Sequence, residues 1–321
     1  GIYNFRDIKA GGRIMVKVRV PATSANLGPG FDSMGLALGL YNYVTAEETD
    51  AGLVIDILDD SKKFLATDEG NLVYRSMKTV FDKVGYTCKG LHLTLENNIK
   101  VTRGLGSSSA GIVSGLLAAN EMTGRQLSMD TLLYMATEIE GHADNVTPAL
   151  LGGFTVTVKN YNRIQYVRCD IKDDLRFAAL IPDFFLQTKK ARGILPHSVP
   201  MRDAVYNTGH SALLATSIMT GKYENIRTAV GDKLHQRYRK RLIPKMDDLF
   251  KTCYANDALG VYLSGAGPTI IAIVHRDNQT FEEEMRQILS QRMHGWSLYM
   301  LKADNQGAVV CRDDDRDDRA K

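Results

Sequence analysis

The sequence lacks the features that mark several classes of protein. No two of its four cysteines form a CxxC pair, and no Cys/His pair stands at zinc spacing; the cysteines are Cys88, Cys169, Cys253 and Cys311. This excludes a zinc ribbon and predicts reduced thiols. No stretch reaches the roughly 18 consecutive apolar residues of a membrane-spanning helix, and the N-terminus has no basic-then-apolar leader. We therefore expect a cytoplasmic protein with no membrane partner.

The chain also lacks a large excess of charge of either sign. The 40 Lys and Arg against 37 Asp and Glu leave a net charge of +3 over 321 residues, which makes no electrostatic case for nucleic-acid binding. The most basic run, KLHQRYRKRLIPK (233–245), has no aromatic RNA-binding motif beside it. We interpret it as a solvated helix face and expect no nucleic-acid partner; RNA binding is the alternative for this segment.

No internal repeat is visible, and the remaining patterns mix strands with helices. The length and the 44% hydrophobic content allow two domains with buried cores. Alternating and β-branched runs predict strands at 14–20, 39–49, 52–58, 90–98, 150–160, 175–184, 260–274 (two strands around a glycine loop) and 296–311. Apolar residues at helical spacing predict helices at 71–85, from the serines near 107 to about 123, 128–141, 203–221, 224–231 and 280–293. Because no regular βαβ order appears, we predict an α+β fold with largely antiparallel sheets.

The segment KVTRGLGSSSAGIVSGLLAAN (100–120) joins a predicted strand to a predicted helix through glycines and three serines. The first N–H groups of a helix have no partner within it, and glycines let the backbone curl around a ligand. The helix dipole also favours negative charge at this end. The hydroxyls of Ser107, Ser108 and Ser109 can donate to a ligand or bind magnesium. The segment predicts a phosphate-binding loop, with a plain loop and helix cap as the alternative.

Three familiar kinase and nucleotide patterns do not fit. A Walker A loop needs Lys after its last glycine, and no Lys follows Gly111. The dinucleotide fingerprint GxGxxG fails because Ser109 in one place and Ser33 in another replace its third glycine. The HRD at 275–277 is followed by Glu282 where a protein-kinase loop has Asn, and by no DFG. The predicted phosphate loop is therefore of another class.

Three segments together resemble the GHMP small-molecule kinases. GLGSSSA (104–110) is similar to the central phosphate motif of that family, VPATSANLGPGFDSMGLAL (20–38) to its first motif and LSGAGPTIIAIV (263–274) to its third. Within the family the chain is most similar to the homoserine kinases, through EIEGHADNVTPALLGG (138–153), TKKARGILPHSVPMRDAVYN (188–207) and YRKRLIP (238–244). The resemblance covers roughly residues 14–311 and departs at Lys100, where relatives usually have proline.

The resemblance implies a fold, two domains and a reaction. The implied GHMP kinase fold has an N-terminal ATP-binding domain like domain 2 of ribosomal protein S5 (14–165) and a C-terminal ferredoxin-like α/β sandwich (166–311), with flexible termini at 1–13 and 312–321. The implied reaction transfers the γ-phosphoryl group of ATP, with Mg²⁺, to the side-chain hydroxyl of L-homoserine. The expected assembly is a homodimer.

The resemblance also implies which residues hold the nucleotide and the metal. Ser108 and Glu140 match the family's magnesium ligands, and a hydroxyl, a carboxylate and phosphate oxygens suit that ion. The competitor of Glu140 is Glu138, which we interpret as a solvated helix charge. An Asn helix cap explains Asn71 as well as an adenine contact does. The implied ATP-binding residues are Asn71, Lys100, Val101, Thr102, Arg103, Gly104, Leu105, Gly106, Ser107, Ser108, Ser109 and Ala110.

The acceptor side is implied in the same way. Homoserine is a zwitterion, and the planar forks of Arg192 and Arg239 suit its carboxylate, with Arg241 as the competitor of Arg239. His142 is either a direct contact or a structural residue. The implied substrate-binding residues are Asn26, Asp32, His142, Arg192, Arg239 and Gly267, and the implied catalytic residues are Asp32, Ser108, Glu140 and Asn145.

Two questions stay open at this level. Asp32 either accepts the hydroxyl proton as a general base or only orients the substrate, and we favour orientation with electrostatic stabilisation. The alternatives to homoserine are mevalonate or a sugar, as in other GHMP kinases, or an inactive relative that senses a metabolite. The intact Ser108, Glu140 and Asp32 argue against an inactive protein, and the two arginines with GHADN (141–145) favour the amino acid.

Overall fold

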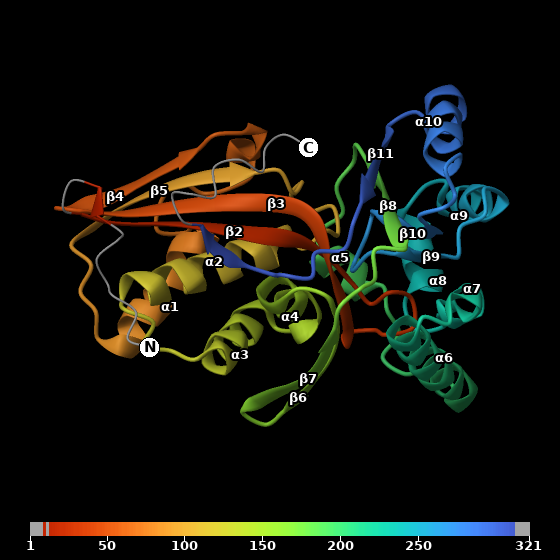
Figure 1. The fold of residues 1–321 in the computed structure, drawn as a ribbon, viewed down its shortest axis with the longest axis horizontal. Coiled ribbons are helices and arrows are strands. Elements are labelled where there is room, and N and C mark those ends of the chain that lie inside the picture. Colours follow the sequence, from red (N-terminus) through yellow and green to blue (C-terminus); the bar gives the residue numbers. More distant parts are fainter. Residues whose placement is uncertain (1–8, 11–12, 312–321) are drawn as a thin grey trace.

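The protein consists of two sheet-based parts that lie side by side (Figure 1). The computed structural model describes residues 9–10 and 13–311; residues 1–8, 11–12 and 312–321, which make up most of the two termini that we expected to be flexible, lie outside the described part. Helices pack on both sheets, and the α+β prediction is confirmed. Within the described residues, no helix is both long and apolar enough to cross a lipid bilayer.

The larger sheet is built mainly from the first half of the chain. All its strand pairs are antiparallel except β4 with β5, so the prediction of largely antiparallel pairing is confirmed. In the described part of the chain its eight strands are β1 (Lys9–Ala10), β2 (Arg13–Ala25), β3 (Met34–Thr49), β4 (Gly52–Ile57), β5 (Gly90–Asn97), β6 (Phe154–Asn160), β7 (Arg163–Cys169) and β12 (Val309–Cys311).

The strand that we expected to end near Pro21 continues further. The pairing of β2 with β3 shifts register between Pro21 and Ala22 and then resumes to Ala25. Proline has no N–H for the ladder, so an irregularity at this point is the usual way for a strand to accommodate it. The extension carries the chain of the first motif directly into the junction between the two parts.

Four helices pack beneath the larger sheet (Figure 1): α1 (Leu72–Val84), α2 (Ser107–Met122), α3 (Met129–Glu140) and α4 (Ala143–Leu151). The first three match the expected helices. The central helix, α2, is buried on most of its surface because it packs between β2, α1 and the other helices, so its sequence is apolar nearly all round. The sequence did not predict α4, since it is short and contains Pro148.

The smaller sheet belongs to the second half of the chain. Its strands are β8 (Leu175–Pro182), β9 (Gly260–Leu263), β10 (Ile270–His275) and β11 (Trp296–Leu301), all antiparallel in the order β11-β8-β10-β9. With helices between β8 and β9 and between β10 and β11, this is the split βαβ arrangement of a ferredoxin-like domain. The helices are α5 (Thr188–Gly193), α6 (Met201–Thr220), α7 (Ile226–Ala229), α8 (Gln236–Arg239), α9 (Met246–Ala255) and α10 (Phe281–Arg292).

The strand β8 explains why the second half folds onto the first. Its sequence LRFAALIP is apolar almost throughout, which is typical of a strand buried on both faces. Phe177, Ala179 and Ile181 join the core that includes the larger sheet, whereas Ala178 and Leu180 join a second core with α9 and α10. The smaller sheet is therefore a middle layer.

The glycine loop between β9 and β10 ties the three motifs together. The N–H of Gly265 donates to the carbonyl of Ala25 (3.0 Å), and the hydroxyl of Ser264 donates to the carbonyl of Gly104 (2.6 Å). Segments separated by more than 150 residues thus meet at one junction. The division that we placed between residues 165 and 166 falls within β7, which pairs in the larger sheet, and the domain boundaries stay a prediction.

Candidate active site

The N-terminus of α2 opens at the junction of the two parts. Gly104 and Gly106 have positive φ angles of 78° and 70°, so the chain turns sharply before Ser107. A Cβ on Gly104 would lie 2.5 Å from the carbonyl oxygen of Ser264, which only glycine avoids. Gly106 is the N-cap and provides no side-chain cap, so the first N–H groups of the helix are available to a ligand.

Glu140 at the end of α3 faces this helix start. Its carboxylate accepts hydrogen bonds from the hydroxyls of Ser108 (2.8 Å) and Ser109 (3.1 Å). Burial raises the pKa of Glu140, although both hydroxyl bonds and nearby His142 oppose the shift. A hydroxyl and a carboxylate side by side are hard oxygen ligands of the kind that Mg²⁺ prefers.

A metal ion bound at this place would need oxygen atoms from a bound phosphate as well as from the protein. Among residues 9–10 and 13–311, no group of three or more His, Cys, Asp or Glu side chains could hold a metal ion. Magnesium commonly binds through one or two protein oxygens together with phosphate oxygens and water. Ser108 and Glu140 beside the uncapped start of α2 fit that mode.

The loop of the first motif lies opposite α2. Asn26, Leu27 and Asp32 all have positive φ angles, and the loop is braced by its own side chains. The amide of Asn26 donates to the carbonyl of Gly265 (2.9 Å) and accepts from the N–H of Asp32 (3.0 Å). Asn26 thereby fixes the position of Asp32, and Asp32 is paired with Arg192 of α5 by two hydrogen bonds.

Arg239 of α8 is almost completely buried, at 1% exposure. Its guanidinium donates to the carbonyl oxygens of Ala191 (3.2 Å) and Gly265 (2.9 Å). Burial lowers the pKa of Arg239 to about 10, and the charge of Arg192 adds to the effect. The group stays charged at neutral pH, and no carboxylate of residues 9–10 or 13–311 is bonded directly to it, which makes the site attractive to an anion.

His142 and Asn145 lie on the α4 side of the site. Nδ1 of His142 is 2.6 Å from Oδ1 of the buried Asp144, and Oδ1 of Asn145 accepts from the hydroxyl of Thr23 (2.8 Å). Burial alone would lower the pKa of His142, but the hydrogen bond and negative charge of Asp144 outweigh it and raise the pKa. This direction favours the protonated, positively charged form of the imidazole.

These groups surround one cavity of about 430 Å³. Most of the predicted site residues line it together: Asn26, Asp32, Asn71, Val101, Thr102, Arg103, Gly104, Gly106, Ser107, Ser108, Glu140, His142, Asn145, Arg192 and Arg239. The predicted residues outside its lining are Lys100, Leu105, Ser109, Ala110 and Gly267. Of these, Ser109 reaches the site through Glu140, and Leu105 and Ala110 are core residues. Their predicted contacts with ATP or substrate stay predictions.

Sequence reasoning missed several lining residues. Phe64, Leu65 and Ala66 follow the short 3₁₀ helix η1 (Asp60–Lys63) and form an apolar wall with Leu72 and Val73. Nothing in the segment KKFLATDEG resembles a binding motif, so no signal singled it out. Asn71 at this wall caps α1 by accepting from the N–H of Val73 (2.9 Å), so its capping interpretation is confirmed.

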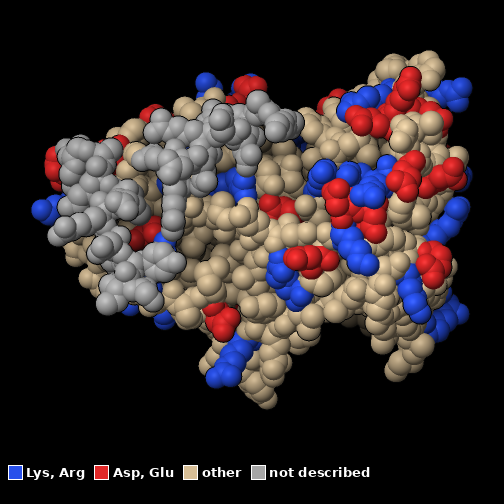
Figure 2. Space-filling model, viewed as in Figure 1, with Lys and Arg blue, Asp and Glu red and all other residues tan. Residues whose placement is uncertain are grey.

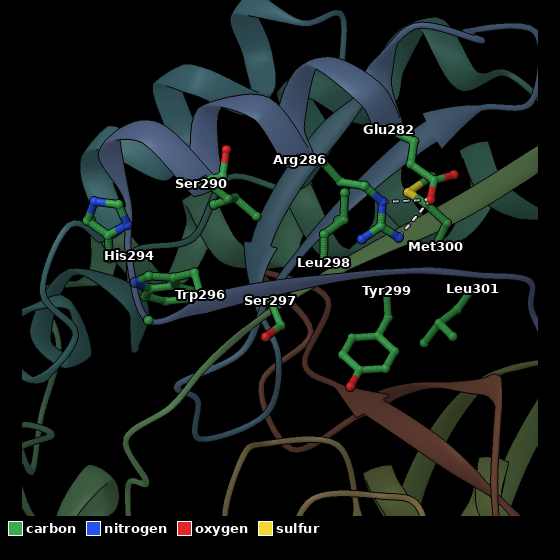
Figure 3. Close-up of a pocket in the computed structure, with 12 residues that line it drawn as sticks. Glu282, Arg286, Ser290, His294, Trp296, Ser297, Leu298, Tyr299, Met300 and Leu301 are labelled. Carbon is green, nitrogen blue, oxygen red and sulfur yellow. Dashed lines mark hydrogen bonds and ion pairs between the residues drawn. The ribbon is translucent and has the colours of Figure 1, made fainter.

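A larger hollow, about 860 Å³, lies elsewhere along the edge strand β11 and beside α10. Figure 3 shows the ion pair of Arg286 with Glu282 on the helix side, with Ser297 and Tyr299 pointing away from α10. The hollow holds none of the predicted residues. On the face drawn in Figure 2, this part of the molecule mixes both signs of charge without a large patch of either. The smaller cavity is the better candidate, because buried charges converge there.

Comparison with known proteins agrees with this geometry. Residues 71–153 match the GHMP kinases N terminal domain, and residues 212–291 match the GHMP kinases C terminal domain. The chain is 47% identical over 301 residues to a homoserine kinase of Clostridium botulinum, covering 94% of this chain and 100% of that protein. It is 46% identical over 298 residues to a homoserine kinase of Caldicellulosiruptor bescii, covering 92% and 97% of the two chains.

The chain belongs to the homoserine kinase family. The crystal structure of homoserine kinase from Cytophaga hutchinsonii superposes with a TM-score of 0.86 at 30% identity, over 97% of this chain and 100% of that one. The GHMP kinase fold and the homoserine kinase resemblance predicted from the motifs are both confirmed.

Proposed function

We propose that the protein is an ATP-dependent kinase that phosphorylates the side-chain hydroxyl of L-homoserine, giving O-phospho-L-homoserine and ADP in threonine biosynthesis. The homoserine kinases that share nearly half of its residues support this reaction. One observation carries the proposal: the cavity joins a phosphate-binding helix start to two arginines and an aspartate. That combination suits a nucleotide at one end and an amino-acid alcohol at the other.

The nucleotide occupies the end of the cavity nearer α2. In this proposal the N–H groups of Gly104 to Ser109 bind the phosphates, and the apolar wall at Phe64 and Leu65 contacts the base. Ser108 and Glu140 would hold Mg²⁺, which would supply positive charge against the phosphates. Glu140 keeps the Ser108 hydroxyl oriented, because the hydroxyl donates to the carboxylate and leaves its lone pairs free.

The acceptor occupies the other end. Arg239 and Arg192 bind its carboxylate, and Asp32 with Asn26 orients its hydroxyl toward the phosphates. Phosphoryl transfer depends mainly on alignment and charge stabilisation, so a strong base is not required. We therefore assign Asp32 the role of orienting the hydroxyl after the acceptor has displaced it from Arg192, and the hydroxyl proton passes to a phosphate oxygen.

The proposal is tested by one coupled ADP-release assay with Mg-ATP. L-homoserine is compared with mevalonate, galactose and L-serine, and we expect turnover with L-homoserine alone at low concentration. Activity with mevalonate but not with homoserine would overturn the substrate while leaving the family intact. No ADP release with any acceptor would contradict the kinase activity itself.

We further propose that the enzyme works in the cytoplasm on soluble small molecules, without nucleic acid or membrane. Retention of an RNA ladder at 150 mM salt, where only substantial phosphate contact survives, would contradict this. The expected homodimer stays a prediction, which light scattering after size-exclusion chromatography checks directly.

A further inference from the structure

His235 touches two parts of the proposed acceptor site, and no sequence motif singled it out. It is the N-cap residue of α8, and its side chain is fully buried. Its Nε2 lies 2.8 Å from the carbonyl oxygen of Gly28, and its Nδ1 lies 3.1 Å from Nη1 of Arg239. One imidazole therefore joins the loop that carries Asp32 to a carboxylate-binding arginine.

The two partners determine which nitrogen carries the proton. A carbonyl oxygen can only accept a hydrogen bond, so Nε2 is protonated; a guanidinium can only donate, so Nδ1 is bare. Burial lowers the pKa of His235, the negative charges of Asp232 and Asp32 oppose this shift, and the charge of Arg239 adds to it. The ring is neutral, with its one proton on Nε2.

This bare nitrogen completes the set of acceptors that orients Arg239. Nε donates to the carbonyl of Ala191, and Nη1 donates to the carbonyl of Gly265 and to His235. These three bonds use three of the five N–H donors of an arginine. Among the described residues, Nη2 has no hydrogen-bond partner, so its two hydrogens are left for a ligand in the cavity that Arg239 lines.

The ring also packs on Phe31, the aromatic side chain beside which both arginines lie. It stacks on Phe31, with centroids 5.3 Å apart and planes at 28°. The guanidinium groups of Arg239 and Arg192 lie 5.4 and 5.6 Å from the same Phe31 ring. Asp232 holds the turn in place, because its carboxylate accepts from the N–H groups of Leu234, His235 and Gln236.

We propose that His235 is a positioning residue that selects an acceptor with a carboxylate. Its bare Nδ1 holds the Arg239 guanidinium with Nη2 facing the acceptor, and its Nε2–H keeps the Asp32 loop in register with that arginine. The inference rests on the proposed function and adds to it the residue that makes carboxylate recognition specific.

Two amide substitutions separate the two contacts. The Oδ1 of His235→Asn takes the place of Nδ1 and keeps an acceptor for Arg239, whereas the amide of His235→Gln reaches the position of Nε2 and keeps a donor for Gly28. A lost bond to a charged group corresponds to a change of about 10–100-fold. We expect His235→Gln to raise the KM for L-homoserine by that factor, and His235→Asn by less than about 3-fold. The KM for ATP should stay unchanged in both.

The acceptor itself provides the selective readout. 3-Aminopropan-1-ol is homoserine without the carboxylate. The kcat/KM for L-homoserine divided by the kcat/KM for 3-aminopropan-1-ol therefore measures carboxylate recognition. This ratio should fall in His235→Gln and stay near the wild-type value in the control His92→Gln, since His92 lies on β5 beside Asp56 and outside the cavity. Equal effects of Asn and Gln, or an equal loss with both acceptors, would overturn the proposal.

A measurement on the wild-type enzyme keeps the test valid if the variants do not fold. Imidazole ¹⁵N spectra, with His235 assigned through its backbone, should show a proton on Nε2 only at pH 7. They should also show a shift of Nδ1 on adding L-homoserine but not on adding Mg-ATP. A proton on Nδ1 at pH 7 would overturn the assignment. If the wild-type enzyme does not phosphorylate homoserine, the proposed function is contradicted instead. If the enzyme is active but His235→Gln leaves carboxylate recognition unchanged, only the role of His235 is contradicted.

Discussion

Arg192 and Asp32 form a two-bond ion pair within the proposed acceptor site, with Nη1 3.0 Å from Oδ2 and Nη2 2.7 Å from Oδ1. The side chains are 37% and 35% exposed. A pair of this exposure contributes only about 0.2–1 kcal/mol, so a ligand can separate the partners at small cost. The two groups neutralise each other in the free site, and in the proposed function an acceptor would bring its own carboxylate to Arg192 and its hydroxyl to Asp32.

The variant Asp32→Asn distinguishes orientation from base catalysis. Because we expect Asp32 to orient the acceptor, the change should raise the KM for L-homoserine and lower kcat by less than about tenfold. General-base catalysis would contribute about 10²–10⁴-fold to turnover. Steady-state kinetics at saturating Mg-ATP measure both parameters, and a fall in kcat of that size with little change in KM would assign the base role to Asp32.

The variant Arg192→Lys tests the need for a planar fork. Lysine keeps the positive charge but cannot make two parallel bonds to a carboxylate. We expect the KM for L-homoserine to rise by about tenfold, equivalent to roughly 1.4 kcal/mol, with the KM for ATP unchanged. Arg241→Lys is the matched control, because Arg241 is exposed in the 3₁₀ helix η3 (Lys240–Leu242) and does not line the cavity. Equal effects in both variants would contradict the assignment.

The variant Glu140→Gln tests the metal site. A metal ion contributes several kcal/mol of charge stabilisation, so we expect kcat to fall by about 10²-fold and the Mg²⁺ concentration for half-maximal rate to rise. Glu138→Gln is the control, since Glu138 is two residues away and paired with Lys159 on the surface. Wild-type activity in Glu140→Gln over a Mg²⁺ titration would remove Glu140 from the metal site.

The raised pKa of Glu140 also predicts that the stability of the protein depends on pH. Because the pKa of Glu140 is raised in the folded protein, the folded state binds this proton more tightly than the unfolded chain does. The resulting stability is present below the unfolded-state pKa of about 4.3 and is lost as the pH rises through the folded-state value. Without Mg²⁺, Glu140→Gln should therefore melt at a higher temperature than the wild type at pH 7, with a smaller difference at pH 4. An unchanged or lower melting temperature at pH 7 would contradict this.

Two glycine substitutions should change the free energy of unfolding in opposite directions. Gly104→Ala tests the backbone of the proposed phosphate loop, and Gly209→Ala is its comparison in a helix. Gly104→Ala puts a Cβ 2.5 Å from the carbonyl oxygen of Ser264 at a φ of 78°, and strain of this kind costs about 1–3 kcal/mol before the steric conflict is counted. Gly209→Ala lies within α6 with nothing near the new Cβ, and is expected to stabilise by about 0.4–1 kcal/mol. Urea unfolding measures both, and a neutral Gly104→Ala would show that the loop relaxes.

Local patterns were sufficient for much of the fold. The apolar spacing of 71–85 and 128–141 predicted α1 and α3 within about one residue of their observed ends, because Asn71 and Ser128 are N-caps and Gly85 and Gly141 close the helices. The missed helices α4, α5 and α9 are short or carry proline, and their stability comes from packing. Propensity over so few residues is too weak to reveal such helices.

Composition and periodicity were enough to predict the fold class. The motifs, through the family that they resemble, were enough to predict most residues of the cavity, since a motif depends on residues close together in the chain. Which charges face one another depends on contacts between distant segments. The pairing of Arg192 with Asp32 spans 160 positions, and the bond from His235 to the carbonyl of Gly28 spans 207. Neither leaves a periodic signal, because burial and hydrogen-bond geometry arise only when the two sheets pack together.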